Sequence, residues 1–323
     1  MIVMREQLRP YFAHNDYLQY LAEWGIIGVG LAGAALVLAV WGAVKTWPCV
    51  RGAQRDIGKP RSGNKFAFVL GAGFGLVAIL IHSFVDFNTH IPANAILAVS
   101  LMALLSSCLR FATDRYWVTV RWWGKVLGCA VMLAGAVYLG QQGWRNANEY
   151  LWLRRAARAP LFSPAQADCL KKALAAEPMN FETVYSIGEV YRIKSSEGGD
   201  DYQDLSNQAM TWFERSMKLN PWDAYSYLRY GWCLDWLGRF ADSPKYFERA
   251  AQLEPNGYYM MANIGLHYVQ AGDFAAAKPW LERSLRLEQK DNEIARSYLP
   301  IVNSRLLEAA TNEFSAKLSA PVK

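Results

Sequence analysis

Charged side chains are scarce in this chain of 323 residues, because Lys, Arg, Asp and Glu make up 19% of it and hydrophobic residues 53%. Four windows contain none of these four types: 24–44, 66–85, 87–109 and 126–144. A helix needs about 20 apolar residues to cross a bilayer, which is close to the length of each window. An ordinary soluble enzyme, a disordered chain and a disulfide-built secreted domain are excluded. The sequence predicts a membrane protein with a soluble tail.

Residue types that often carry chemistry are also few. The chain has four histidines and five cysteines, and it lacks a Gly-rich phosphate loop, a Ser-His-Asp elbow and a nucleotide fingerprint. The spacing of Cys49, Cys108 and Cys129 is unlike that of a metal site. A zinc site at His82, Asp86 and His90, which have helical i, i+4, i+8 spacing, is the alternative, but we expect the turn and Pro92 to break that helix. We therefore expect neither a metal nor a cofactor. The sequence leaves open whether Cys169 and Cys233 of the tail form a disulfide.

The uncharged windows predict about four membrane helices, since a backbone inside lipid must satisfy its own polar groups. We expect these helices at roughly Trp24–Val44, Phe66–Val85, Ile91–Leu109 and Val126–Gly140. The loop after the first holds six basic residues and one acidic residue, and the loop after the third holds four and one. Short basic loops remain in the cytoplasm. The basic charge therefore indicates topology, and we expect no nucleic-acid partner.

This orientation places the N-terminal segment, the turn around Asp86 and the whole tail on the opposite side of the membrane. In a bacterium that side is the periplasm. We therefore expect a multi-pass protein of the bacterial inner membrane with a periplasmic tail.

A period of 34 residues runs through the tail from about residue 221. It aligns Gly231 with Gly265 and Gly238 with Gly272, and an earlier copy around Gly188 is offset by an insertion. Two helices separated by a glycine at this period are the tetratricopeptide signature. The concave surface of such a stack usually binds a peptide or a protein.

The fold class that follows is all-α, with polytopic membrane helices followed by a soluble tetratricopeptide-repeat α-solenoid. We expect the end of a periplasmic loop at 1–23, a four-helix membrane domain at 24–144, a linker at 145–164 and the repeat domain with a C-terminal capping helix at 165–323. The sole histidine of the tail, His267, is expected to pack rather than react. Seven large side chains fit the inward positions of the repeats: Trp212, Phe213, Tyr230, Phe247, Tyr268, Trp280 and Leu281.

The other three histidines fall at the predicted outer surface of the membrane. Polar residues accompany them, and together the group comprises His14, Asn15, Asp16, Glu23, His82, Asp86, Asn88 and His90. Ionisable groups beside membrane helices are costly and often functional. A neutral imidazole at His14 could accept a proton from a sugar or protein hydroxyl, or it could be an interfacial histidine with no chemical role.

Two segments carry a resemblance to a known family. The first is His14-Asn15-Asp16-Tyr17-Leu18-Gln19 with the following 21–28, and the second is the stretch from His82 to Asn94. Both resemble segments of the O-antigen ligase family, which includes O-antigen polymerases and bacterial protein O-oligosaccharyltransferases. The similarity covers roughly residues 10–110, and the repeat tail fits the same subgroup.

The resemblance implies transfer of a glycan from an undecaprenyl-diphosphate carrier to an acceptor hydroxyl in the periplasm, without a metal. It implies that His14 activates or positions the acceptor, which is lipid A core, a polysaccharide or a protein. Arg9 and Arg5 are the candidates for binding the diphosphate. Asp86 either orients His14, faces the acceptor or caps a turn. The supporting or acceptor-site candidates are Asn15, Asp16, Glu23, His82, Asp86 and His90.

Members of that family have many more membrane helices than the four expected here, so the similarity is to their C-terminal part. The chain is then a truncated product, a fragment or one half of a split enzyme, and whether it is an enzyme alone stays open. The alternative is a non-catalytic, membrane-anchored repeat scaffold for cell-envelope assembly.

Overall fold

The computed structural model describes residues 14–52, 63–110 and 119–319. These residues form twelve α-helices and one short 3-10 helix and contain no strand, so the predicted all-α class is confirmed for the described part of the chain. The described residues divide into two compact units, one formed by those up to Gly128 and one by those from Cys129 onward. We call them the N-terminal unit and the repeat unit.

The N-terminal unit contains α1 (Asp16–Gly52), α2 (Gly63–His82), η1 (Asn88–His90) and α3 (Pro92–Arg110). The helical backbone of α1 is interrupted at Gly25, whose φ of 65° and ψ of −178° are not helical. Such a conformation suits glycine because it has no Cβ.

Two of the helices are long and apolar enough to cross a membrane by length and composition, at Asp16–Lys45 within α1 and Trp122–Arg158 in α4. The apolar parts of α2 and α3, Ala67–His82 and Pro92–Ser107, are shorter. Within the part of the chain that the structure describes, two spans meet this criterion, where the sequence predicted about four. The turn over 83–91 shortens both middle windows, because α2 ends at His82 and α3 begins at Pro92.

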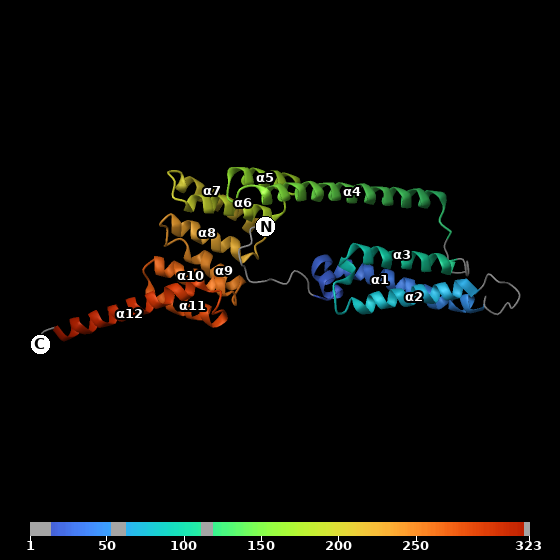
Figure 1. Cartoon of the computed structure of the whole chain (residues 1–323). Helices are drawn as coiled ribbons and strands as arrows, with labels where there is room; N and C mark the ends of the chain where they lie inside the picture. The colour runs from blue at the N-terminus through green and yellow to red at the C-terminus, as the bar shows by residue number, and fades with distance from the viewer. Residues whose placement is uncertain (1–13, 53–62, 111–118, 320–323) are drawn as a thin grey trace. The chain divides into compact units, whose positions relative to one another are not determined.

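The repeat unit is a succession of paired helices (Figure 1). The end of α4 (Trp122–Arg158) precedes the remaining members, which are α5 (Pro164–Ala176), α6 (Phe181–Ser196), α7 (Tyr202–Leu219), α8 (Ala224–Trp236), α9 (Pro244–Leu253), α10 (Tyr258–Gln270), α11 (Phe274–Leu287) and α12 (Glu293–Ser319). The turns α8–α9 and α10–α11 each contain a glycine with positive φ, Gly238 at 74° and Gly272 at 81°.

Each of three successive pairs places a glycine of its first helix against a large side chain of its second. A Cβ at these glycines would lie 2.6–2.9 Å from the facing side chain, and the pairs are Gly188 with Phe213, Gly231 with Phe247, and Gly265 with Leu281. Of the seven side chains predicted to be core, four are buried and three are partly buried against the core clusters. The repeat prediction is confirmed at this level.

The predicted linker at 145–164 is largely helical, because α4 continues as far as Arg158. Arg145 Nη2 donates to Glu177 Oε1 at 3.2 Å, and Glu149 Oε1 accepts from Asn180 Nδ2 at 2.6 Å. Ala156 belongs to a core cluster of the repeat unit. The last turns of α4 therefore act as the partner helix of α5. Polar residues after 140 mark the end of the apolar span and not the end of the helix.

Candidate functional site

Asp86 brings the two segments of the predicted site together in the N-terminal unit. His14 Nδ1 lies 3.8 Å from Asp86 Oδ1, and His82 Nε2 lies 3.6 Å from Asp86 Oδ2. Asp86 Oδ1 also accepts a hydrogen bond from the backbone N–H of Phe87 at 2.8 Å. The side chains of His14 and His82 are 71% and 55% exposed. Two imidazoles are thus open to a ligand and face one carboxylate.

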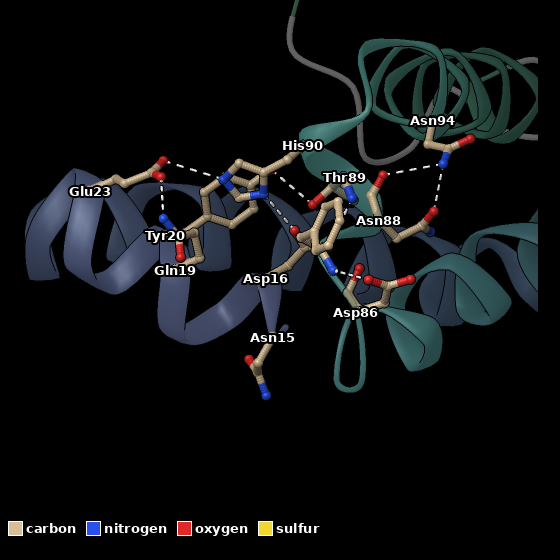
Figure 2. A network of polar contacts seen from close by, with 12 residues as sticks. Asn15, Asp16, Gln19, Tyr20, Glu23, Asp86, Asn88, Thr89, His90 and Asn94 are labelled. Atoms are coloured by element: carbon tan, nitrogen blue, oxygen red, sulfur yellow. Dashed lines mark hydrogen bonds and ion pairs between the residues drawn. The ribbon is translucent and has the colours of Figure 1, made fainter. Parts of the chain in front are cut away.

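Asp16 is the centre of a second group of polar contacts, which Figure 2 shows. Its side chain is 2% exposed. Oδ1 lies 2.7 Å from His90 Nδ1, and Oδ2 accepts from the backbone N–H of Thr89 at 2.9 Å. The N–H of Asp16 donates to Ser83 O at 2.9 Å. The first residue of α1 therefore holds both ends of the turn between α2 and α3.

His90 lies between two carboxylates, since its Nε2 is 3.3 Å from Glu23 Oε2. Partial burial lowers the pKa of His90, but hydrogen bonds to Asp16 and Glu23 raise it more, so the pKa lies above its ordinary value. The ring stacks on Tyr20 with a centroid distance of 4.7 Å. Tyr20 OH donates to Thr89 Oγ1 at 2.8 Å.

Asn15 and Asn88 form hydrogen bonds that involve nearby backbone groups. Asn15 Oδ1 accepts from Leu18 N at 3.0 Å at the start of α1, and its amide donates to Phe84 O at 2.9 Å. Asn88 O accepts from Asn94 Nδ2 at 3.2 Å. These three contacts position the start of α1 and the segment between α2 and α3.

The structure gathers the predicted residues into two groups, one around Asp86 and one around Asp16. Arg5 and Arg9 lie outside the described residues. Sequence reasoning missed Tyr20 and Thr89. Helical spacing could have found Tyr20, because residues four apart share a face and Tyr20 follows Asp16 by four. Among the described residues, no group of three or more His, Cys, Asp or Glu could hold a metal ion.

The repeat unit contains a buried charge network. Arg229 is 0% exposed, and its Nε lies 3.3 Å from Glu189 Oε1. Arg192 Nε and Nη2 donate to the two carboxylate oxygens of Glu189 at 2.7 and 3.1 Å. Arg229 Nη1 also donates to Tyr259 OH at 3.0 Å. This network joins α6, α8 and α10.

His267 is buried, as expected, and its Nδ1 lies 2.8 Å from Asp235 Oδ2 and 3.4 Å from Ser243 Oγ. A hydrolytic triad uses opposite ring nitrogens for the acid and the serine, so this arrangement is not one. Cys169 and Cys233 are free thiols. Burial raises the pKa of the Cys233 thiol to about 12.

Comparisons with known proteins concern the repeats. A tetratricopeptide-repeat family model matches residues 258–291, which contain α10 and α11. No curated protein matches the chain. Nothing in these comparisons supports the O-antigen ligase resemblance, which stays a prediction.

Several solved structures are similar to this chain. A MamA protein is 17% identical, with 55% of this chain and 99% of that one covered and a TM-score of 0.39. A thermophilic TPR protein in Thermus thermophilus is 14% identical, with 66% and 94% covered and a TM-score of 0.43. YrrB, a TPR protein with an unusual peptide-binding site, is 16% identical, with 77% and 96% covered and a TM-score of 0.34. By the family match, the chain contains a tetratricopeptide repeat at 258–291.

Proposed function

We propose that this protein is a membrane-anchored tetratricopeptide-repeat scaffold whose repeat unit binds a protein partner. The observation that carries the proposal is the repeat at 258–291 within a stack of paired helices whose first member, α4, is also an apolar helix of membrane-spanning length. Stacked repeats form extended surfaces suited to protein binding.

Helix α4 supports the membrane anchor. Trp122 and Trp123 lie at its start and Trp144 lies 22 residues after Trp122, which is about 33 Å of helix at 1.5 Å per residue. The hydrocarbon core is about 30 Å thick, and tryptophan is enriched at both of its surfaces. Arg121 precedes the helix at the proposed cytoplasmic end. The repeats then follow in the periplasm of a bacterial inner-membrane protein.

A photocrosslinking amino acid tests the partner. It is placed in living cells either at Trp236, an exposed residue of α8, or at Gln252, an exposed residue of α9. We expect a discrete crosslinked protein from position 236 and little from position 252. No adduct from either position in a stably inserted protein contradicts the proposal.

Glycan transfer is the second candidate. The observation that favours it is the approach of both His14 and His82 to Asp86, since these residues come from the two segments that resemble the O-antigen ligase family. In that proposal His14 takes the proton of the acceptor hydroxyl, whose oxygen attacks the sugar carbon bonded to the carrier. The bond to the diphosphate breaks, and the leaving diphosphate keeps the electron pair. Arg5 and Arg9 are the proposed diphosphate ligands.

The variant His14→Ala tests this second candidate in membranes supplied with lipid-linked glycan and acceptor. Loss of a positioned proton acceptor should lower transfer by about 10²–10⁴-fold, while helix content stays unchanged because the side chain is mostly exposed. Near-normal transfer by His14→Ala removes the proposed role.

A further inference from the structure

The turns that connect successive helix pairs of the repeat unit lie next to one another. We call them together the turn edge, which comprises residues 177–180, 220–223 and 254–257. At each turn, an arginine near the end of the second helix of the following pair makes a contact. Arg215 Nη2 donates to Pro178 O at 3.3 Å, the Arg249 guanidinium lies 5.7 Å from the centroid of the Trp222 ring, and Arg283 Nη2 donates to Pro255 O at 2.8 Å. The repeats therefore present these turns along one edge.

The first of these turns lies beside α4, at the point where its apolar part ends. Arg145 of α4 donates to Ala176 O and to Glu177 Oε1, both at 3.2 Å, at the C-terminal end of α5. The stretch from Arg145 to the end of α4 at Arg158 spans about 20 Å at 1.5 Å per residue, and α5, with 13 residues, has the same length. Helix α5 therefore runs back along α4 as far as Arg145, whose neighbour Trp144 ends the uncharged window.

In the proposed membrane anchor, this level of α4 is the headgroup layer of the bilayer. The hydrocarbon core is about 30 Å thick and the whole bilayer about 40–45 Å, which leaves about 5–7 Å of headgroups on each side. The first turn is level with the end of the apolar stretch, and the other two turns follow it along the same edge. The turn edge therefore faces the headgroups and not open solvent.

Two of the three turns expose a large apolar side chain. Met179 is 70% exposed and Trp222 is 75% exposed, whereas turns that face water are dominated by Gly, Pro, Asn, Asp and Ser. Tryptophan is enriched where the membrane meets water, because its ring is apolar and its N–H is polar. The exposed tips of these turns have the chemistry of a membrane interface.

The charges of the same turns permit contact with lipid phosphates. Glu177 Oε2 is paired with Arg145 at 3.2 Å. Asp223 is 9% exposed, and its Oδ2 accepts from the backbone N–H of Ser226 at 2.9 Å. The guanidinium of Arg249 lies beside the exposed indole, and guanidinium groups match the geometry of phosphate oxygens.

We propose that the turn edge rests on the phospholipid surface of the bilayer that α4 crosses, with the Trp222 indole among the headgroups. The proposal rests on the membrane anchor of the scaffold and adds a second attachment to it. The stack of repeats then lies along the membrane surface. The opposite ends of the same helices, which include Trp236, face away from the lipid and remain open to a protein partner.

The test places an environment-sensitive fluorescent amino acid in the full chain, in nanodiscs of phosphatidylcholine and phosphatidylglycerol that contain a lipid with a nitroxide on its headgroup. The nitroxide quenches fluorescence at short range, so we expect strong quenching at position 222. Position 236 is the matched control, because Trp236 ends the helix that begins just after Trp222, about 18 Å further along α8. A fluorophore there should stay bright.

Two matched substitutions examine the role of the indole. Trp222→Ser should reduce the quenching of a fluorophore at Met179, whereas Trp236→Ser should leave that quenching unchanged. Both tryptophans are exposed, so neither change should disturb the repeats. Equal quenching at positions 222 and 236 overturns the membrane contact. A blue-shifted but unquenched signal at position 222 also overturns it, because a protein surface, such as a second copy of the chain, would then cover the edge.

A fluorophore at Val131 separates this proposal from the anchor on which it rests. Val131 is exposed within the apolar stretch of α4, and a nitroxide on the lipid acyl chain should quench a fluorophore there. Quenching at Val131 without quenching at Trp222 overturns the role of the turn edge alone. Absence of quenching at Val131 overturns the anchor and, with it, the membrane-anchored scaffold.

Discussion

At the scale of single residues, His90 couples the turn between α2 and α3 to α1 through charge. Its imidazole contacts Asp16 and Glu23, and the two carboxylates raise its pKa above the ordinary value. A group whose pKa is raised by folding stabilises the fold fully below its unfolded pKa, and the contribution is lost as pH rises through the folded pKa. The turn over 83–91 should therefore be held most firmly in mildly acidic solution.

Hydrogen exchange measures this effect in backbone amides of residues 83–91. After correction for intrinsic rates, we expect slow exchange near pH ~6, close to the unperturbed histidine pKa, and faster exchange as pH rises through the raised pKa. His90→Asn should remove the pH dependence. Protection that increases with pH in the unaltered chain would show that the assigned ion pairs do not hold the turn.

Gly231 is a second residue whose role can be stated, because the space beside it is too small for a larger side chain. A Cβ there would lie 2.9–3.1 Å from three ring atoms of Phe247, which is 1% exposed. Overpacking of this kind costs about 1–3 kcal/mol, so Gly231→Ala should lower the free energy of unfolding of the repeats in urea pulse proteolysis. Gly143→Ala is the control, because a Cβ at Gly143 meets nothing within 4 Å. Equal stability of the two variants would contradict the packing.

At the scale of elements, the Glu189 network holds α6, α8 and α10 together with two guanidinium groups and one carboxylate. Removal of Arg229 leaves Glu189 paired with Arg192, whereas removal of the carboxylate leaves two partly or fully buried cations without their shared counter-charge. An uncompensated buried charge costs about 3–5 kcal/mol.

We therefore expect Glu189→Gln to destabilise the repeats more than Arg229→Met does. Urea unfolding followed by pulse proteolysis gives both free energies under one condition. A larger loss in Arg229→Met would mean that packing of the Arg229 stem outweighs the charge balance.

The elements also show what could be predicted from the sequence. The repeats could be predicted, because Gly231 and Gly265 recur at the same period as Phe247 and Leu281, the side chains that they contact. The extension of α4 beyond the apolar stretch could not be predicted from the sequence. Hydropathy identifies only the part of a helix that is apolar, whereas Glu149 lies in the polar extension and accepts a hydrogen bond from Asn180 in a later turn. The gathering of the three histidines was anticipated, but the central position of Asp16 depends on backbone geometry that no local pattern encodes.

At the scale of the whole molecule, the distribution of basic residues predicts the side on which each part lies. A cysteine placed at Lys290, which is exposed in the repeat unit, should react with a membrane-impermeant maleimide in intact cells. A cysteine at Arg121 should react only after the inner membrane is opened, because basic loops stay in the cytoplasm. The reverse pattern of labelling contradicts the topology.

The unbroken helix α4 has a mechanical consequence. A helix turns about 100° and rises 1.5 Å per residue. The number of residues between the apolar stretch and the repeats therefore sets the azimuth of the repeats, which is the direction they face around the axis of α4, and their height above the membrane. One alanine inserted after Gly140 should swing the repeats by about 100°, while seven should lift them by about 10 Å and restore the azimuth to within about 20°. Crosslinking at Trp236 should fall with one insertion and recover with seven if the partner is fixed at the membrane. Equal crosslinking yields for the two insertions would mean that α4 connects the membrane and the repeats flexibly and not as a rigid helix.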